Sequence, residues 1–180
     1  MVEHLRRVSM NEVSEILKKH LLWLQEKPGG VRADLSRCDL RLMNFSLTVL
    51  VAADLSHSDL SRTNFFCANM QFADLTGAKL SDANFQGVDL SFGELDDVSI
   101  SHSDFTLAKI NYANLRKVEG REVCLNRADL SHSSLKEVNL RGASLIDCSF
   151  VDTRQTYVDF RNALQDGADH TGAFCIGCKY

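Results

Sequence analysis

Several features that are common in other protein classes are scarce in this sequence. Its 180 residues include one proline (Pro28), one tryptophan and three tyrosines, and no apolar run approaches the roughly 18 residues that span a membrane. The first ten residues carry two arginines without a following apolar stretch, so we expect no secretory signal peptide. The net charge of −4 lacks the basic excess of nucleic-acid-binding domains, and we therefore expect no direct binding of nucleic acid.

The composition is that of one globular domain, with 44% hydrophobic and 24% charged residues. Charge is spread unevenly along the chain. Residues 31–105 carry 11 acidic and five basic side chains, whereas residues 106–180 carry nine acidic and ten basic ones. We therefore expect an acidic first half and local basic clusters in the second half, where these bases gather: Arg116, Lys117, Arg121, Lys136 and Arg141.

A five-residue period runs from residue 33 to the C-terminus. Positions whose numbers end in 3 or 8 are small, and Met43 is the only large residue among these 30. Positions ending in 0 or 5 are Leu, Ile, Met or Phe at 24 of 30 places from residue 35 onward. This period fits neither a helix nor an alternating strand. We expect a chain that turns a corner every five residues and points one small and one large side chain inward from each block.

The blocks resemble the A-[DN]-L-x-x unit of the pentapeptide-repeat family over about residues 31–163. The direct matches are Ala33-Asp34-Leu35, Ala53-Asp54-Leu55, Ala68-Asn69-Met70, Ala73-Asp74-Leu75, Ala83-Asn84-Phe85, Ala113-Asn114-Leu115 and Ala128-Asp129-Leu130. The resemblance implies an all-β fold, a right-handed quadrilateral β-helix with four blocks to a coil. The expected organisation is an N-terminal segment 1–30, a β-helix 31–165 and a C-terminal end 166–180 that could form a last partial coil.

Four blocks per coil stack residues that are 20 apart in sequence. The expected inward ladders are Leu35, Leu55, Leu75, Leu95, Leu115 and Leu135 on one side, and Phe45, Phe65, Phe85 and Phe105 on another. Four residues that are not large and apolar occupy such inward positions, and they predict looser coils: Gly120, Gln155, Gln165 and His170.

Residues 9–27 predict an N-terminal capping α-helix. Ser9 and Glu12 form a capping-box pattern, and Pro28-Gly29-Gly30 ends the helix. Val13, Ile16, Leu17, Leu21 and Leu24 follow helical spacing and predict an apolar side. We favour a helix that covers the first coil, and a partner-binding or membrane-surface helix is the alternative. The C-terminal end has no comparable helix and is a candidate dimer contact.

Two groups of residues resemble chemical sites. Cys175 and Cys178 form a CxxC near His170, which suggests half a zinc site or a redox pair. Both cysteines fall on inward positions and no second ligand pair exists, so we favour packing and expect no metal and no cofactor. The six cysteines show no pairing pattern, which predicts reduced thiols in a cytosol.

The second group consists of three Ser-His-Ser sequences, centred on His57, His102 and His132. Each histidine occupies the last, outward position of its block, and the three lie on different faces of the predicted rod. Catalysis needs convergent groups in a pocket, which a filled tube does not provide. We therefore expect no catalytic residues and no enzyme.

Outward Asp and Asn residues form columns, such as Asp34, Asp54, Asp74 and Glu94. We favour a structural role for them, in which their side chains satisfy backbone groups at the corners. The alternative is mimicry of DNA, since some members of the resembled family bind DNA gyrase as duplex mimics. The column changes to Asn114, Ser134 and Arg154 after four coils, which makes the imitation incomplete.

One outward column is aromatic: Phe72, Phe92 and Tyr112 are 20 residues apart and occupy the last position of their blocks. We call these three residues the aromatic strip. Mutual stacking that stiffens the rod is one interpretation. The other is a contact surface for a partner protein or a second copy of the chain, because exposed apolar patches mark interaction sites.

The leading hypothesis for function is a non-enzymatic protein-binding or scaffold rod, bacterial and cytoplasmic, with secretion as an effector the alternative location. Its expected partner is a protein, or a second copy bound through the aromatic strip or the C-terminal end. The alternative functions are a DNA-mimicking binder of gyrase or topoisomerase and a metal or redox protein that uses Cys175 and Cys178.

Overall fold

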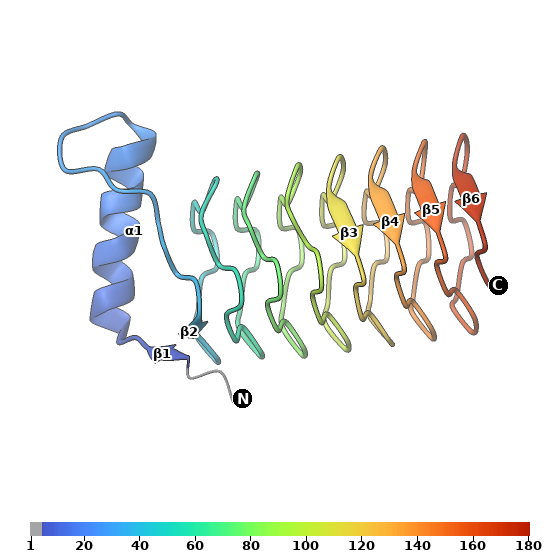
Figure 1. The fold of residues 1–180 in the computed structure, drawn as a ribbon, viewed down its shortest axis with the longest axis horizontal. Coiled ribbons are helices and arrows are strands. Elements are labelled where there is room, and N and C mark those ends of the chain that lie inside the picture. The colour runs from blue at the N-terminus through green and yellow to red at the C-terminus, as the bar shows by residue number, and fades with distance from the viewer. Residues whose placement is uncertain (1–4) are drawn as a thin grey trace.

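The computed structural model describes residues 5–180; residues 1–4 of the predicted N-terminal segment lie outside the described residues. One helix, α1 (Met10–Leu24), stands at one end of a rod of stacked coils, and the C-terminus lies at the other end (Figure 1). The strands are short: β1 (Arg6–Arg7), β2 (Cys38–Asp39), β3 (Asn114–Arg116), β4 (Ser134–Lys136), β5 (Arg154–Thr156) and β6 (Phe174–Ile176). None of the helices within residues 5–180 has the length and apolar character needed to cross a membrane.

Neighbouring coils are joined by parallel bridges between residues 20 apart, such as Asp34 with Asp54 and Asp54 with Asp74. The Leu35 amide donates to the Asp54 carbonyl at 2.8 Å, and the Asp54 amide donates to the Ala33 carbonyl at 3.0 Å. Strands β3 to β6 form one parallel sheet in chain order, with Asn114 opposite Ser134. The 20-residue register that the sequence predicts is therefore the register of the structure.

The corners between blocks adopt a left-handed backbone conformation that is energetically unfavourable for most residues. The last residue of many blocks has a positive φ, for example 64° at Leu42 and 60° at Phe72. The preceding Asx side chains hold these turns: Asp54 Oδ1 accepts from the Ser56 amide at 3.0 Å and from its hydroxyl at 2.7 Å. The outward Asp and Asn columns thus have the corner-forming contacts that the sequence analysis favoured.

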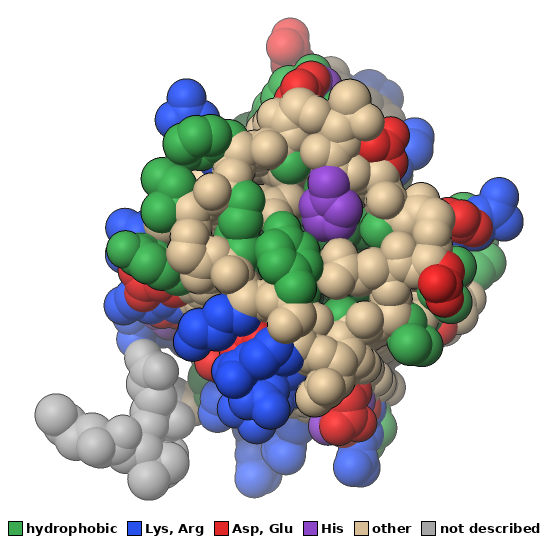
Figure 2. All heavy atoms as spheres, turned by 90° about the vertical axis from the view of Figure 1, so that its right-hand side faces the viewer, with side chains coloured by type: hydrophobic (Ala, Val, Ile, Leu, Met, Phe, Trp, Pro, Cys, Tyr) green, Lys and Arg blue, Asp and Glu red, His purple; other side chains and the backbone are tan. Residues whose placement is uncertain are grey.

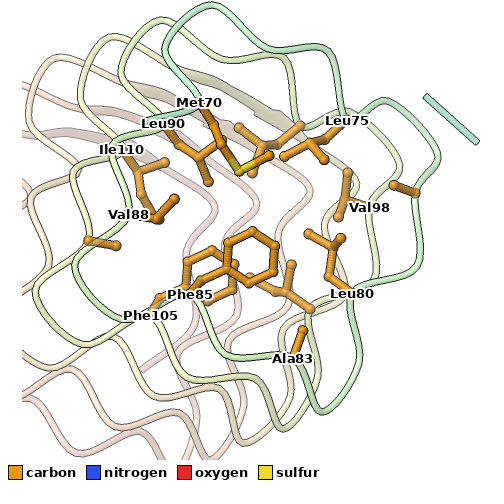
Figure 3. Close-up of a cluster of buried hydrophobic side chains, with 14 of the residues drawn as sticks. Met70, Leu75, Leu80, Ala83, Phe85, Val88, Leu90, Val98, Phe105 and Ile110 are labelled. Carbon is orange, nitrogen blue, oxygen red and sulfur yellow. The ribbon is translucent and has the colours of Figure 1, made fainter. Parts of the chain in front are cut away.

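The interior of the rod is filled by ladders of large side chains. Phe45, Phe65, Phe85 and Phe105 are buried and stack in sequence, with ring centroids 5.0, 4.8 and 4.6 Å apart. Figure 3 shows the rings of Phe85 and Phe105 at the centre of such a cluster, with the small side chain of Ala83 nearby. Alternation of large and small inward residues leaves a packed core along the rod.

The irregular core positions are accommodated by their neighbours. At Gly120 an added Cβ would lie 3.1 Å from Leu140 Cδ2 and 3.2 Å from Ile100 Cγ1, so the expected loose packing is wrong there. Gln155 is fully buried, and its amide donates to Thr153 Oγ1 at 2.9 Å. The Gln155 amide also lies 3.4 Å from His170 Nδ1, and His170 Nε2 lies 3.1 Å from Gln165 Oε1. These three polar side chains are linked where apolar residues are missing, although Gln155 Oε1 is buried without a hydrogen-bond partner.

Helix α1 begins where the sequence predicts, because the Ser9 hydroxyl accepts from the Glu12 amide at 3.2 Å. It ends at Leu24, three residues before the expected end at residue 27, because Glu26 takes a positive φ of 53°. Gly30 then passes so close to the helix that an added Cβ would clash with the backbone of Trp23.

The face of α1 that packs on the first coil differs from the expected one at two positions. Val13 is buried, and Ile16 and Leu17 pack against the core, as predicted. Leu21 is 43% exposed, whereas His20 is fully buried. His20 Nδ1 accepts from the Ala33 amide at 3.1 Å, and burial lowers the pKa of this imidazole. The coil's first amide needs an acceptor, which an imidazole supplies and a leucine does not.

No described residue covers the C-terminal end of the rod. Figure 2 looks onto this end, where hydrophobic side chains and a histidine are visible inside the ring that the last coil forms. Phe174, Ile176 and Tyr180 are 62, 47 and 69% exposed. Phe174 and Ile176 take outward positions of β6, opposite Arg154 and Thr156 of β5, whereas Tyr180 follows the buried Phe160 by 20 residues. The last coil therefore presents apolar side chains to solvent, and that of Tyr180 takes a position that is buried in the coil before.

Candidate protein-contact surface

The structure places the aromatic strip on one edge of the rod. Phe72, Phe92 and Tyr112 are 55, 46 and 50% exposed. The rings of Phe72 and Phe92 are stacked with centroids 4.9 Å apart, and those of Phe92 and Tyr112 are stacked at 5.1 Å. All three residues occupy positive-φ corners, which point their side chains away from the core. The strip is thus a continuous, ordered column of rings with its edges in water.

The column is one residue longer than the sequence analysis proposed. The imidazole of His132 stacks on Tyr112 with centroids 4.7 Å apart. His132 Nδ1 also lies 3.7 Å from Asp152 Oδ2, in the next coil along the same edge. The 20-residue spacing alone could have added His132, because it follows Tyr112 in the same register.

Carboxylates flank the strip on both sides. Asp74 and Glu94 lie on the face that continues into β3, and Asp89 lies on the face at the other side of the edge. Within residues 5–180 none of these three has a basic side chain within ion-pair distance; Asp89 accepts from Gln71, and Glu94 accepts from Asn114. A partner that covers the strip therefore meets apolar ring edges beside carboxylates, of which Asp89 has Lys109 as its neighbour in the next coil.

Other exposed apolar side chains do not form such a column. Phe66 is 43% exposed, and Leu47 and Leu107 are 72 and 53% exposed on the neighbouring edge. Leu47 and Leu107 are separated by Cys67 and Gly87 in the same corner column, so neither stacks on the other. Among the described residues, the aromatic strip is the longest run of stacked rings on the outside.

The two groups that resembled chemical sites remain apart from the strip. Cys175 and Cys178 are joined by a disulfide at the C-terminal end, so the expectation of reduced thiols is wrong for this pair. His57 lies over Gly77 and His102 lies 3.5 Å from Glu122, each in a different corner column from His132. No group of three His, Cys, Asp or Glu side chains within residues 5–180 is arranged to hold a metal ion.

Several outward carboxylates are held in their charged form. Hydrogen bonds from the Ser36 hydroxyl and amide lower the pKa of Asp34. Arg161 donates to both carboxylate oxygens of Asp159, at 2.9 and 2.6 Å, and lowers its pKa to about 2. Asp39 has the same arrangement with Arg41. These contacts belong to corners of the fold and form no common pocket.

A rod of parallel coils with a 20-residue register and Asx corners defines a repeat protein of the pentapeptide class. The chain belongs to the pentapeptide-repeat family: the family model for pentapeptide repeats matches eight copies, in residues 31–65, 44–82, 83–119 and 124–154. Members of this family are typically non-enzymatic structural or binding proteins. The family confirms the expected β-helix, and its solved structures imply a right-handed one, which the parallel strands fit.

Among solved structures, the chain is similar to HetL, a pentapeptide-repeat protein involved in heterocyst differentiation regulation in the cyanobacterium Nostoc. The two share 29% identity over 83% of this chain and 81% of HetL, with a TM-score of 0.54. It is more distantly similar to QnrB1, a plasmid-mediated fluoroquinolone resistance protein, at 20% identity over 76% of this chain and 72% of that one, with a TM-score of 0.44. A search of the curated proteins found no match.

Proposed function

We propose that this protein is a non-enzymatic rod that binds a protein partner, a different protein or a second copy of the chain, through the aromatic strip. In this proposal each coil has a four-sided cross-section, α1 caps the N-terminal end, and the strip occupies one long edge. The observation that carries the proposal is the exposure of three stacked rings, Phe72, Phe92 and Tyr112, each about half in water. Aromatic side chains dominate the energetics of protein interfaces.

The corner geometry does not require the aromatic side chains of the strip, which supports a contact role for them. Burying one such ring against a partner contributes on the order of 1.5–3 kcal/mol. The rings are already ordered by stacking, so they would lose little side-chain entropy when a partner docks. Alanine or serine would satisfy the corner geometry equally well, as Ala52 does at the same position one coil earlier.

The relative HetL supports a binding role of this kind. HetL is a pentapeptide-repeat protein involved in the regulation of heterocyst differentiation. In this chain side chains fill the interior of the described coils, which supports a role in binding at the surface. We place the protein in the cytoplasm of a bacterium on this proposal, because four of its six cysteines, including buried Cys38 and Cys148, are free thiols; Cys175 and Cys178, which form a disulfide, are the exception.

The runner-up is a DNA-mimicking inhibitor of gyrase or topoisomerase. The column Asp34, Asp54, Asp74 and Glu94 is the observation in its favour. This column carries one negative charge per coil, that is, one per roughly 4.8 Å of the rod, whereas duplex DNA carries one per about 1.7 Å of its axis. Further along the same column the residue is the basic Arg154. A gyrase supercoiling assay separates the two: inhibition at stoichiometric protein would favour the mimic.

The direct test is affinity capture from a bacterial lysate with wild-type protein and the Phe92→Ser variant as bait. Leu107→Ser is the matched control, because Leu107 has the same block position and is 53% exposed on a different edge. We expect a specific protein to be retained by wild type and by Leu107→Ser and to be lost with Phe92→Ser. Equal retention by all three baits would contradict a contact role for the strip.

A further inference from the structure

No described element covers the long faces of the rod, and one of these faces is distinguished by its side chains. It carries strands β3 to β6 in its second half and the column Asp34, Asp54, Asp74 and Glu94 in its first half (Figure 1). The aromatic strip forms one margin of this face. We call it the β3–β6 face and include both corner columns that border it.

The charge of the side chains on this face changes from negative to positive about its midpoint, which lies between Glu94 and Asn114. We propose that the partner of the β3–β6 face is a second copy of this chain, packed antiparallel about a two-fold axis through that midpoint. The inference rests on the proposed function, because it identifies what covers the aromatic strip. In such an isologous interface each residue meets one that lies equally far beyond the midpoint.

Charge is complementary in this arrangement. Asp54 and Arg154 lie the same number of coils from the midpoint, in the same column, and within residues 5–180 neither has an ion-pair partner. Asp54 of one copy would therefore face Arg154 of the second copy, and the reverse. At the far corner column Asp97, which lies 4.0 Å from Arg116 Nη2 of its own chain, corresponds to Lys117, which has no ion-pair partner within residues 5–180.

The aromatic column is symmetric about the same midpoint. Phe92 of one copy would face Tyr112 of the second, and Phe72 would face His132. The stack of four rings thus has its centre where the charge pattern reverses. Two independent features of the sequence, rings on one margin and charges on the face and the other margin, select the same axis.

The two ends of the face also match. An open groove of about 730 Å³ lies between α1 and the first coil, and its lining includes Ile16, Val31 and Asp34. The residues of the last coil that would meet this end are Phe174 and Ile176, which are 62 and 47% exposed. Apolar side chains that water covers in one copy would enter a partly apolar groove in the other.

Displacing the axis by half a coil removes the match. An axis through Glu94 places Glu94 opposite Glu94 and Asp97 opposite Asp97 of the second copy. An axis through Asn114 places Lys117 opposite Lys117. Like charges directly opposite one another disfavour an interface. The register with the axis between these two residues brings no like charges together on the face.

The experiment uses two charge-reversal variants of the full chain, Asp54→Arg and Arg154→Asp, in sedimentation equilibrium. The two positions are five coils apart, roughly 24 Å within one chain, so they do not interact intramolecularly. Either variant alone places like charges opposite each other twice. We expect each to raise the dimer dissociation constant at least about tenfold. An equimolar mixture of both should recover wild-type affinity as a heterodimer, because both pairs then become opposite charges.

Asp59→Arg is the control: Asp59 makes the same Asx contacts to Ser61 that Asp54 makes to Ser56, but it lies on the neighbouring face. It should leave dimerisation unchanged, and thermal melting of all variants checks folding. A wild-type protein that stays monomeric, or a mixture that fails to recover, would overturn the antiparallel dimer. If wild type is monomeric and lysate capture still depends on Phe92, the proposed function stands and only its partner is different.

Discussion

The ring of Phe92 stacks on that of Phe72 at 4.9 Å on the outside of the rod, which is nearly the separation of 4.8 Å between Phe65 and Phe85 inside it. Both pairs follow the spacing of the coils. Phe85 is fully buried, whereas Phe92 is 46% exposed. The same stacking geometry thus places the Phe65–Phe85 pair in the core and leaves the Phe72–Phe92 pair exposed to a partner.

We expect Phe85→Ala to lower the free energy of unfolding by about 3–5 kcal/mol, because it removes a ring from the middle of a packed ladder. Phe92→Ser should leave the thermal midpoint nearly unchanged, because the ring is half in water and its corner tolerates small residues. Thermal and urea unfolding of both variants measure this. A large loss of stability in Phe92→Ser would assign the strip to the structure alone.

The stack of coils was predictable from the sequence because every coil repeats the same local contacts. The five-residue period set the inward ladders, and the 20-residue register placed Phe72, Phe92 and Tyr112 in one column. The burial of His20 was not predictable, since it depends on where α1 meets the free amide of Ala33 in three dimensions. The disulfide between Cys175 and Cys178 was missed because neighbouring inward positions also suit plain packing.

Stability should fall as the pH decreases through the range in which His20 titrates. Burial lowers the pKa of His20 in the folded protein, so the unfolded chain takes up the proton first, near pH 6.5. The contribution of neutral His20 is complete above that pH and is lost as the pH falls toward the lower folded pKa. We expect His20→Asn, whose side-chain oxygen replaces the Nδ1 acceptor, to remove this part of the pH dependence in urea titrations at pH 5 and 7.5. If the free energy of unfolding of the variant depended on pH as that of wild type does, this role of His20 would be contradicted.

A second loss of stability should occur in stronger acid. The pKa of Asp34 is lowered by Ser36, that of Asp169 by Thr171 and that of Asp159, to about 2, by Arg161. Because these folded pKa values lie below the unfolded ones, the stability they provide is present above about pH 4 and is lost as the pH falls toward 2. Circular dichroism across this range measures the loss for wild type. The loss should be smaller for Asp34→Asn, whose amide oxygen keeps the corner contact without titrating, and an identical curve would refute this assignment.

We expect protein purified without chelator to contain no stoichiometric zinc. The sulfur atoms of Cys175 and Cys178 are bonded to each other, and they belong to no metal-binding cluster within residues 5–180. Elemental analysis before and after mild reduction measures this. The variant with both cysteines replaced by serine should keep its binding activity and fold; one zinc per chain in wild type that this variant loses would restore the metal hypothesis.

The most direct test of the central claim, that the aromatic strip is a contact surface, is fluorine NMR of protein labelled with fluorotyrosine. The three tyrosines report on three surfaces: Tyr112 on the strip, Tyr157 on the far margin of the β3–β6 face and Tyr180 on the C-terminal end. Tyr-to-Phe variants assign the resonances, and the protein is titrated with itself and with any captured partner. We expect the Tyr112 resonance to shift or broaden on binding. Binding that moves only Tyr180, or that leaves Tyr112 unchanged, would contradict it.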